Sequence, residues 1–252
     1  MIPNELKTHN NFGDDNLKKV FITGSTTGLG FLEAKKLIAD GNEVVLHARN
    51  EKKAQAVMQK LPGAKGIVVG DLSSMTDLKN IAQEVNDFGT FDSIIHNAGV
   101  YSNDQKTIFK VNVLAPYVLT ALITKPKSLI YTSSGMHLGS HFTMDKIESG
   151  VNYSASKLLI LLLTKAIARK WQIPSNAVDP GWVPTRMGGD GANDDLKLGY
   201  LTQVKLVEDN TDFSGKYFYH DNETHYDQRA DDIKLQDELL QRLAEISDIQ
   251  LP

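Results

Sequence analysis

A short apolar run near the start of the chain leads directly into a glycine-rich turn, and the turn opens a helical pattern. The run is Lys18 to Thr23, the turn holds glycines at positions 24, 28 and 30, and the pattern reaches Ala39. Glycine is needed where a backbone turns with positive φ and where a phosphate must approach main-chain N–H groups at a helix N-terminus. This strand, turn and helix therefore predict a nucleotide-binding α/β fold, with a plain loop as the alternative.

Strands and helices go on alternating along the rest of the chain. Further strands are expected at about 43–48, 66–70, 91–96, 128–132, 175–179 and 216–219, and helices at 75–87, 107–123, 153–169 and 233–246. The pattern predicts one Rossmann-type doubly wound α/β domain over residues 18–252, with a mostly parallel seven-stranded sheet flanked by helices. Residues 1–17 are predicted to be a flexible N-terminal arm, and about 186–212 a substrate loop.

Composition excludes several classes of function. The formal net charge of −4 comes from mixed acidic and basic residues, which argues against nucleic acid or an anionic membrane as the partner. Without cysteine there is no disulfide, thiolate metal site or cysteine nucleophile. His137 and His141 lie in a loop without a third ligand, so we expect no metal. The polar start and the short apolar runs predict a cytoplasmic protein with a small-molecule partner.

Several polar residues follow the predicted strands, at the sheet edge where ligands bind in open α/β folds. Arg49 follows the second strand, where an arginine is suited to hold a 2′-phosphate, so NADP is favoured over NAD; a solvated arginine is the alternative. Asp71 and Leu72 follow the third strand and could line an adenine pocket, although Asp71, Ser73 or Ser74 could equally cap the next helix.

Two side chains at the start of the longest helical run suggest acid–base chemistry. Tyr153 and Lys157 are four residues apart and should share one helix face. A nearby ammonium would lower the pKa of a phenol, so that it could exchange a proton with an alcohol or ketone. A solvated helix face is the plain alternative. In the helix expected at 107–123, a buried Asn112 must find hydrogen-bond partners, and Pro116 could cap or bend the helix.

Taken in order, these motifs resemble the short-chain dehydrogenase/reductase family, in its compact branch of about 250 residues that includes carbonyl-reductase-like and retinol-dehydrogenase-like members. The resemblance runs from about Lys18 to the strand near Tyr219. The motifs are the turn from Thr23 to Gly30, Asn97-Ala98-Gly99, Asn112, Ser133-Ser134, Tyr153 with Lys157, and Pro180-Gly181 followed by Thr185.

The resemblance implies an NADP(H)-dependent oxidoreductase that moves a hydride between nicotinamide and a carbonyl or alcohol substrate. Tyr153 would be the general acid or base, and Lys157 would lower its pKa and hold the nicotinamide ribose. Ser134, with Ser133 as fallback, would bind the substrate oxygen, and Asn112 would hold a water of the proton relay. The implied cofactor-binding residues are Gly24, Ser25, Thr26, Gly28, Leu29, Gly30, Arg49, Asp71, Leu72, Asn97, Ala98, Gly99, Tyr153, Lys157, Pro180, Gly181, Val183 and Thr185.

The chain departs from the family pattern in two places. Only 15 positions separate Asn97 from Asn112, which bears on the surface through which many relatives form tetramers; a homodimer is the simpler expectation. The long connector after Ser134 suggests a substrate wall built by residues 135–151. The alternative function is a non-catalytic NADP(H)-binding sensor or scaffold of the same fold. An epimerase or dehydratase fits the glycine turn less well, and the motifs do not name the substrate.

Overall fold

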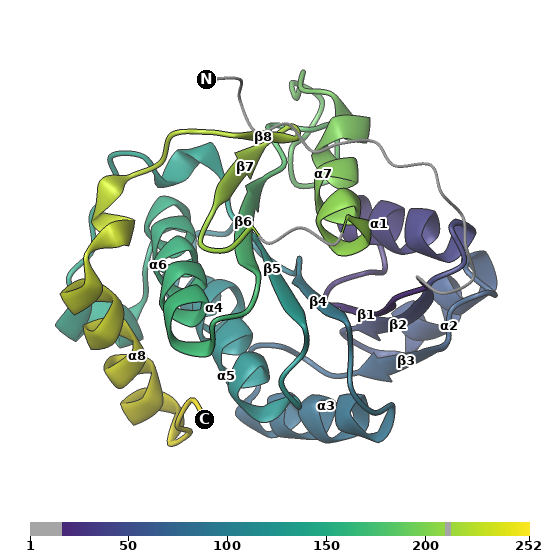
Figure 1. The fold of residues 1–252 in the computed structure, drawn as a ribbon, viewed down its shortest axis with the longest axis horizontal. Helices are drawn as coiled ribbons and strands as arrows, with labels where there is room; N and C mark the ends of the chain where they lie inside the picture. The colour runs from purple at the N-terminus through teal and green to yellow at the C-terminus, as the bar shows by residue number, and fades with distance from the viewer. Residues whose placement is uncertain (1–16, 210–212) are drawn as a thin grey trace.

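Eight strands form one sheet within residues 17–209 and 213–252, the part of the chain that this computed structural model describes. Their order is β3-β2-β1-β4-β5-β6-β7-β8, and every neighbouring pair is parallel except β7 with β8 (Figure 1). The strands are β1 (Lys19–Ile22), β2 (Glu43–Ala48), β3 (Gly66–Val69), β4 (Ser93–His96), β5 (Ser128–Thr132), β6 (Ser175–Asp179), β7 (Tyr217–Tyr219) and β8 (Asn222–Glu223). The predicted arm lies outside the described residues except for Leu17.

Helices cover both faces of this sheet (Figure 1). One face carries α1 (Gly28–Ala39), α2 (Glu51–Lys60) and α7 (Leu196–Glu208), and the other α3 (Met75–Asp87), α4 (Gln105–Phe109), α5 (Ala115–Leu122) and α6 (Tyr153–Trp171). The last helix, α8 (Ile233–Ser247), packs outside α6. The predicted doubly wound α/β domain is therefore confirmed.

Side chains that alternate along each strand belong to two hydrophobic cores, one on each face of the sheet. Val20 and Ile22 of β1 pack with α1 and α7, whereas Phe21 points to the face of α3, α5 and α6. A strand buried on both faces must be apolar throughout, which is why the parallel strands read as continuous apolar runs. Leu239 and Leu243 of the last helix are also fully inaccessible.

The sheet has one strand more than the seven predicted. The additional strand, β8, has two residues and pairs antiparallel to β7 across a two-residue turn. His220 and Asp221 of that turn both have positive φ, 44° and 67°, as a type I′ hairpin turn requires. This turn lacks the Asn-Gly or Asp-Gly signal of such hairpins, so the sequence pattern does not reveal it.

The helix expected over 107–123 is broken into three segments. It begins two residues earlier, with Asp104 capping α4, and continues through a π-helical turn, η2 (Lys110–Leu114), into α5. Pro116 falls in the first turn of α5, where its missing N–H costs little. The π-helical turn contains Asn112, which is buried.

The segment predicted as a substrate loop, about 186–212, is only partly a loop. Residues 196–208 form α7, capped by Asp195, and α7 packs against α1. Gly199 lets α7 lie close to the segment after β6, because a Cβ there would meet the Pro180 carbonyl oxygen at 2.8 Å and the Val183 side chain at 2.9 Å. Residues 186–195 are irregular, and residues 210–212 lie outside the described residues.

Candidate active site

The residues singled out in the sequence meet at one edge of the sheet. They follow the carboxyl ends of β1 to β6, and because these strands are parallel their ends lie side by side. The chain reverses its direction of winding between β1 and β4, which is where ligands bind in doubly wound sheets.

The glycine turn after β1 is held against the end of β4. The Asn97 amide donates to the carbonyl oxygen of Thr23 at 2.9 Å, and the Ala98 N–H donates to the Thr23 hydroxyl at 3.0 Å. A Cβ on Gly30 would lie 2.3 Å from the Asn97 side chain, so only glycine fits there. No side chain caps α1 and its first turn has no acid, so its N-terminal N–H groups suit a pyrophosphate.

His47, on β2, also holds the glycine turn in place. The sequence motifs do not include this residue. Its Nδ1 accepts from the Gly24 N–H at 3.0 Å, so its Nε2 carries the proton and donates to the carbonyl oxygen of Gly70 at 3.0 Å. Burial lowers the pKa of His47 to about 4, which fits a neutral ring. The turn is thereby tied to the ends of both β2 and β3.

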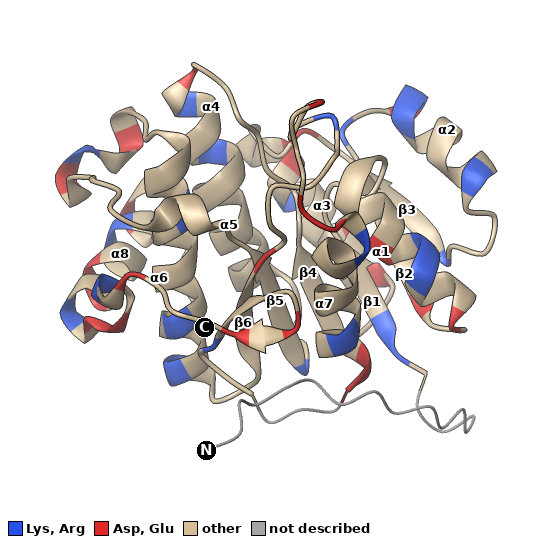
Figure 2. Cartoon of the chain, turned by 90° about the horizontal axis from the view of Figure 1, so that it is seen from above, with Lys and Arg blue, Asp and Glu red and all other residues tan. Residues whose placement is uncertain are grey.

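Three basic side chains come together beside the end of β2. Burial, followed by the positive charges of Arg49 and Arg186, lowers the pKa of Lys53. None of the three is in an ion pair with a carboxylate among residues 17–209 and 213–252. Figure 2 shows basic residues at both ends of α2, whereas both signs mix over α8. Only Arg49 was predicted; Lys53 lies in the first turn of α2, and Arg186 is distant in sequence.

Asp71, at the end of β3, holds the turn that leads into α3. Ser74, not Asp71, caps α3, accepting from the Asp77 N–H. Asp71 instead accepts from the Ser73 N–H at 2.9 Å and hydroxyl at 2.8 Å. Burial opposes ionisation of Asp71, but these hydrogen bonds and the charge of Arg49 outweigh it and lower its pKa. Leu72 is buried.

Ser134 and Tyr153 face each other across the end of β5. Asn152 caps α6 by accepting from the Ala155 N–H, which places Tyr153 at the first position of the helix. Ser134 hydrogen-bonds to Tyr153. Ser133 is 1% exposed and donates to the carbonyl oxygen of Lys157 at 3.0 Å, so its hydroxyl is turned away from the tyrosine. The geometry thus favours Ser134 over Ser133 as the serine that faces a substrate.

Lys157 and Asn112 lie deeper in the same site. The Lys157 ammonium is buried, donates to the carbonyl oxygen of Thr132 at 2.7 Å and lies 5.3 Å from the centre of the Tyr153 ring. Asn112 exchanges two hydrogen bonds with the backbone of Val100 and donates to the Ser156 hydroxyl at 3.1 Å. These contacts give the buried amide its partners.

The expectation that Lys157 lowers the pKa of Tyr153 is wrong for this structure. Burial and then the charge of Asp179 raise the pKa of Tyr153 to about 12, and the hydrogen bond from Ser134 opposes them. Burial also lowers the pKa of Lys157 to about 8, and Asp179 opposes this shift. The physical reason is that both side chains lose hydration, which disfavours the charged form of each.

The turn after β6 closes the site opposite the glycine turn. Gly181 has φ of 80° and its N–H donates to Asp179, while the Trp182 N–H donates to Asp194 at 2.6 Å. Thr185 approaches the glycine turn, since a Cβ on Gly28 would lie 4.0 Å from its side chain. The glycine turn, Asn97 to Gly99, Tyr153, Lys157 and the segment from Pro180 to Thr185 are thus brought together.

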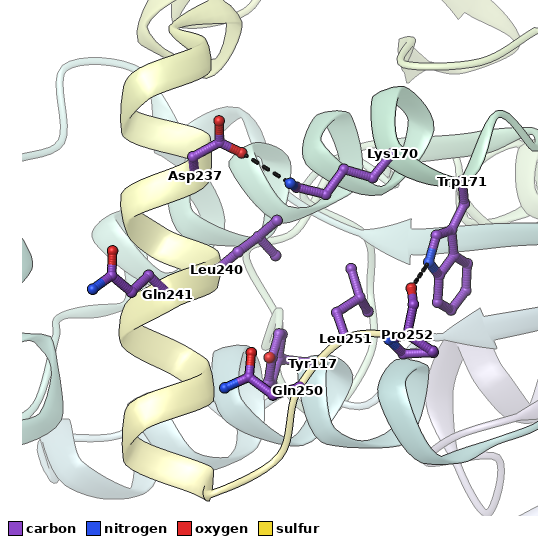
Figure 3. Close-up of a pocket in the computed structure, with 9 residues that line it drawn as sticks. All are labelled: Tyr117, Lys170, Trp171, Asp237, Leu240, Gln241, Gln250, Leu251 and Pro252. Atoms are coloured by element: carbon purple, nitrogen blue, oxygen red, sulfur yellow. Dashed lines mark hydrogen bonds and ion pairs between the residues drawn. The ribbon is translucent and has the colours of Figure 1, made fainter.

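A separate cavity of about 490 Å³ lies at the other end of α6 (Figure 3). It is lined by Trp171, Tyr117 and the chain end at Pro252, with Lys170 and Asp237 joined by an ion pair across it. An α-helix rises about 1.5 Å per residue, so Tyr153 is about 27 Å away along α6. The cavity therefore takes no part in the candidate active site.

Residues 17–209 and 213–252 contain neither a candidate membrane span nor a candidate metal cluster. No helix there is long and apolar enough to span a bilayer. No group of three or more His, Asp or Glu side chains there is placed to hold a metal ion, and His137 is engaged with the Ser134 carbonyl oxygen and the Asp227 N–H.

The chain is similar in sequence to one protein family and to several known proteins of that family. Residues 18–195 match the short chain dehydrogenase family. An uncharacterised oxidoreductase of Emericella nidulans, AN7799, is 36% identical over 93% of this chain and 98% of its own length. The short-chain dehydrogenase chyC of Penicillium rubens is 39% identical over 80% of this chain and 86% of its own.

Solved structures show the same fold at lower identity. An uncharacterised protein from Mycobacterium paratuberculosis superposes with a TM-score of 0.80 at 20% identity, covering 93% of this chain and 95% of its own. The Pseudomonas aeruginosa RhlG/NADP complex has a TM-score of 0.69 at 16% identity, covering 80% and 94%. Fold, motif order and sequence identity agree: the chain is an oxidoreductase that belongs to the short-chain dehydrogenase/reductase family.

Proposed function

We propose that this protein is an NADP(H)-dependent carbonyl reductase or alcohol dehydrogenase. The observation that carries the proposal is the convergence of Ser134, Tyr153 and Lys157 at the sheet edge, next to an uncapped α1 and a glycine turn.

Each residue of the trio has a role that its surroundings support. A nicotinamide bound at this edge supplies or accepts the hydride. Tyr153 keeps its proton to high pH, so it can donate that proton to the oxygen of a carbonyl undergoing reduction. Ser134 can donate a second hydrogen bond to the same oxygen, which helps to orient it. Lys157 is suited to the ribose hydroxyls, and Asn112 to a water of the proton relay.

The basic cluster of Arg49, Lys53 and Arg186 supports NADP over NAD. Three cations that are in no ion pair within the described part of the chain form a surface that attracts a phosphate dianion, and arginine can bind phosphate oxygens in a bidentate manner. The neighbouring fold with NADP bound, RhlG, is consistent with this choice. Location in the cytoplasm and a homodimeric state stay predictions.

Exposed apolar side chains around the site favour substrates that carry an apolar group. Single exposed hydrophobic side chains are ordinary on a protein surface, whereas a group of them gathered in one place marks a binding site. Tyr101 is 65% exposed and Trp182 56%, and they flank the site from the segments after β4 and β6. Met136, Leu138 and Met187 are also exposed, in the segments after β5 and β6. We therefore expect aryl or long alkyl ketones and aldehydes to be preferred.

The test is consumption of NADPH with a panel of aldehydes, ketones and quinones that pairs apolar with polar members. Tyr153→Phe should reduce kcat by about 10²–10⁴-fold, because the proton donor is lost, while NADPH still binds. Tyr117→Phe removes a hydroxyl at the cavity beside Trp171, at the far end of α6 from the site, and is the matched control. Binding of NADPH without turnover of any substrate, and with equal affinity in Tyr153→Phe, would favour the sensor or scaffold alternative.

A further inference from the structure

A buried carboxylate lies beside Tyr153 and has no part in the chemistry described above. Asp179 is the last residue of β6 and is 9% exposed. Its Oδ2 accepts from the Gly135 N–H at 2.7 Å, and its Oδ1 accepts from the Gly181 N–H at 2.9 Å. An ionised carboxylate only accepts hydrogen bonds, so two N–H donors suit the charged form. Asp179 thus links the segment after Ser134 to the turn after β6.

Titratable groups face this carboxylate from three elements. They are Tyr153 and Lys157 of α6, Tyr217 and Tyr219 of β7, and His137 of the short helix η3 (Gly135–His137). Asp194 and His220 flank the adjacent turn at Gly181, and the Tyr101 ring lies 5.1 Å from the Tyr153 ring. Lys157 carries the ammonium group of this set, and Asp179 is the carboxylate that faces it.

The charge of Asp179 acts in the same sense on both members of the α6 pair. A neighbouring anion disfavours a phenolate, and it favours an ammonium ion. Asp179 accordingly adds to burial in raising the pKa of Tyr153, and opposes burial in setting the pKa of Lys157. Both side chains retain their protons to higher pH than they would without it.

We propose that Asp179 is a positioning residue that holds the protons on Tyr153 and Lys157 and thereby sets the alkaline limit of carbonyl reduction. Asp179 takes part in no bond change. It acts through Tyr153 and Lys157, which face the substrate and cofactor, and through the hydrogen bonds that it accepts from Gly135 and Gly181. The kinetic part rests on the proposed function, whereas the effect on proton binding does not.

The first test needs neither cofactor nor substrate. The titration of Lys157 is followed by NMR in protein with labelled lysine, with Lys157→Met identifying its signal. Asp179→Asn should lower the midpoint by on the order of one pH unit, and Asp179→Glu, which keeps the charge, should lower it by much less. Asp194→Asn is the matched control: it removes a carboxylate charge from the same turn and keeps an oxygen that can accept from the Trp182 N–H, and its midpoint should equal that of the wild type.

The second test is the pH profile of kcat/KM for the reduction. In Asp179→Asn its alkaline limb should move to lower pH by a similar amount, whereas a purely structural role would lower the rate equally at every pH. An unmoved limb together with an unmoved Lys157 midpoint would overturn the proposal.

If Asp179→Asn does not fold, Asp179→Ser supplies a neutral variant that keeps one acceptor oxygen and must show the same shift. If no carbonyl is reduced at all, the proposed function fails, and the Lys157 titration still decides the role of Asp179.

Discussion

Burial sets the protonation of the two residues of α6 that face the site more strongly than their attraction for each other does. The spacing of Tyr153 and Lys157 predicts a shared helix face, and the ring and ammonium are indeed neighbours, 5.3 Å apart. The spacing of two residues in the sequence does not show how much hydration each side chain keeps in the folded protein. Since both side chains lose most of their hydration, the pKa of Tyr153 is raised and the pKa of Lys157 is lowered, and the neutral form of each is favoured.

The choice between Ser133 and Ser134 also depends on surroundings that the sequence does not contain. Adjacent residues at a strand end point in opposite directions, so only one of them can face the tyrosine. The Ser133 hydroxyl donates to the backbone carbonyl of Lys157, whereas Ser134 hydrogen-bonds to Tyr153 at the site. Two identical side chains in sequence thus have different contacts.

The basic cluster leads to a prediction at the scale of single residues. Arg49→Ala and Arg186→Ala should each raise KM for NADPH by about tenfold, because a charge-assisted contact to the 2′-phosphate contributes roughly 1–2 kcal/mol at an exposed site. KM for NADH, which lacks that phosphate, should change little. Steady-state kinetics with both cofactors measure the two values.

Lys52→Ala is the control for this prediction, since Lys52 neighbours Lys53 on α2 but has no part in the cluster. Equal losses with NADPH and NADH would show that the arginines support the fold or the adenine rather than a phosphate. The preference for NADP would then need another explanation.

At the scale of elements, α1 and α7 are joined by a buried polar chain. Glu33 of α1 is fully buried, and its Oε1 accepts from the Gln203 amide of α7 at 2.6 Å. Gln203 in turn accepts from the Thr132 hydroxyl of β5 at 3.0 Å. The other Glu33 oxygen, Oε2, has no hydrogen-bond partner among the described residues. An uncompensated carboxylate in a helix interface favours the protonated acid.

This buried acid predicts a pH dependence of stability. Burial raises the pKa of Glu33 from 4.5 to about 8 in the folded protein. A raised pKa means that its contribution is fully present below pH 4.5 and is lost as the pH rises toward 8, by on the order of a few kcal/mol. Glu33→Gln cannot ionise, so its free energy of unfolding should vary less between pH 5 and 8.

Urea unfolding of both proteins across this pH range measures the difference. Glu43→Gln serves as the control, because Glu43 is exposed and paired with Lys65 at the surface. Parallel stability curves for the wild type and Glu33→Gln would show that Glu33 is ionised or hydrated in the folded protein.

At the scale of the whole molecule, the last residues close the face formed by α5 and α6. The Tyr117 hydroxyl donates to the carbonyl oxygen of Ile249 at 2.9 Å, and the Trp171 indole donates to that of Pro252 at 2.9 Å (Figure 3). Leu251 and Ile249 pack against the core of that face. The segment therefore shields two aromatic side chains from different helices.

Removing residues 249–252 should lower the free energy of unfolding by about 1–3 kcal/mol, because two hydrogen bonds and apolar contacts are lost. Thermal unfolding measures the change. The KM for NADPH should stay the same, because the segment is at the far end of α6 from Tyr153. A large loss of cofactor affinity at unchanged stability would contradict this separation between the chain end and the site.

Local patterns in the sequence determined the order of elements and the residues at the strand ends. Apolar runs, glycines between Gly24 and Gly30, and the pair at Tyr153 and Lys157 are local features, and the physics that they report acts over a few residues. They led to the doubly wound domain, to its family, and to the strand-end residues that the fold gathers at one edge.

Only the tertiary structure decided what depends on contacts between distant segments. Asp179, Lys53 and Arg186 join the site because strand ends far apart in the chain meet there, and no local pattern marks them. The helix over 196–208 forms where its apolar side chains can pack on α1, and the two-residue β8 exists because β7 offers it an edge. The direction of the Tyr153 pKa shift follows from burial, which is a property of the folded molecule, because hydration is lost only when other segments close around the phenol.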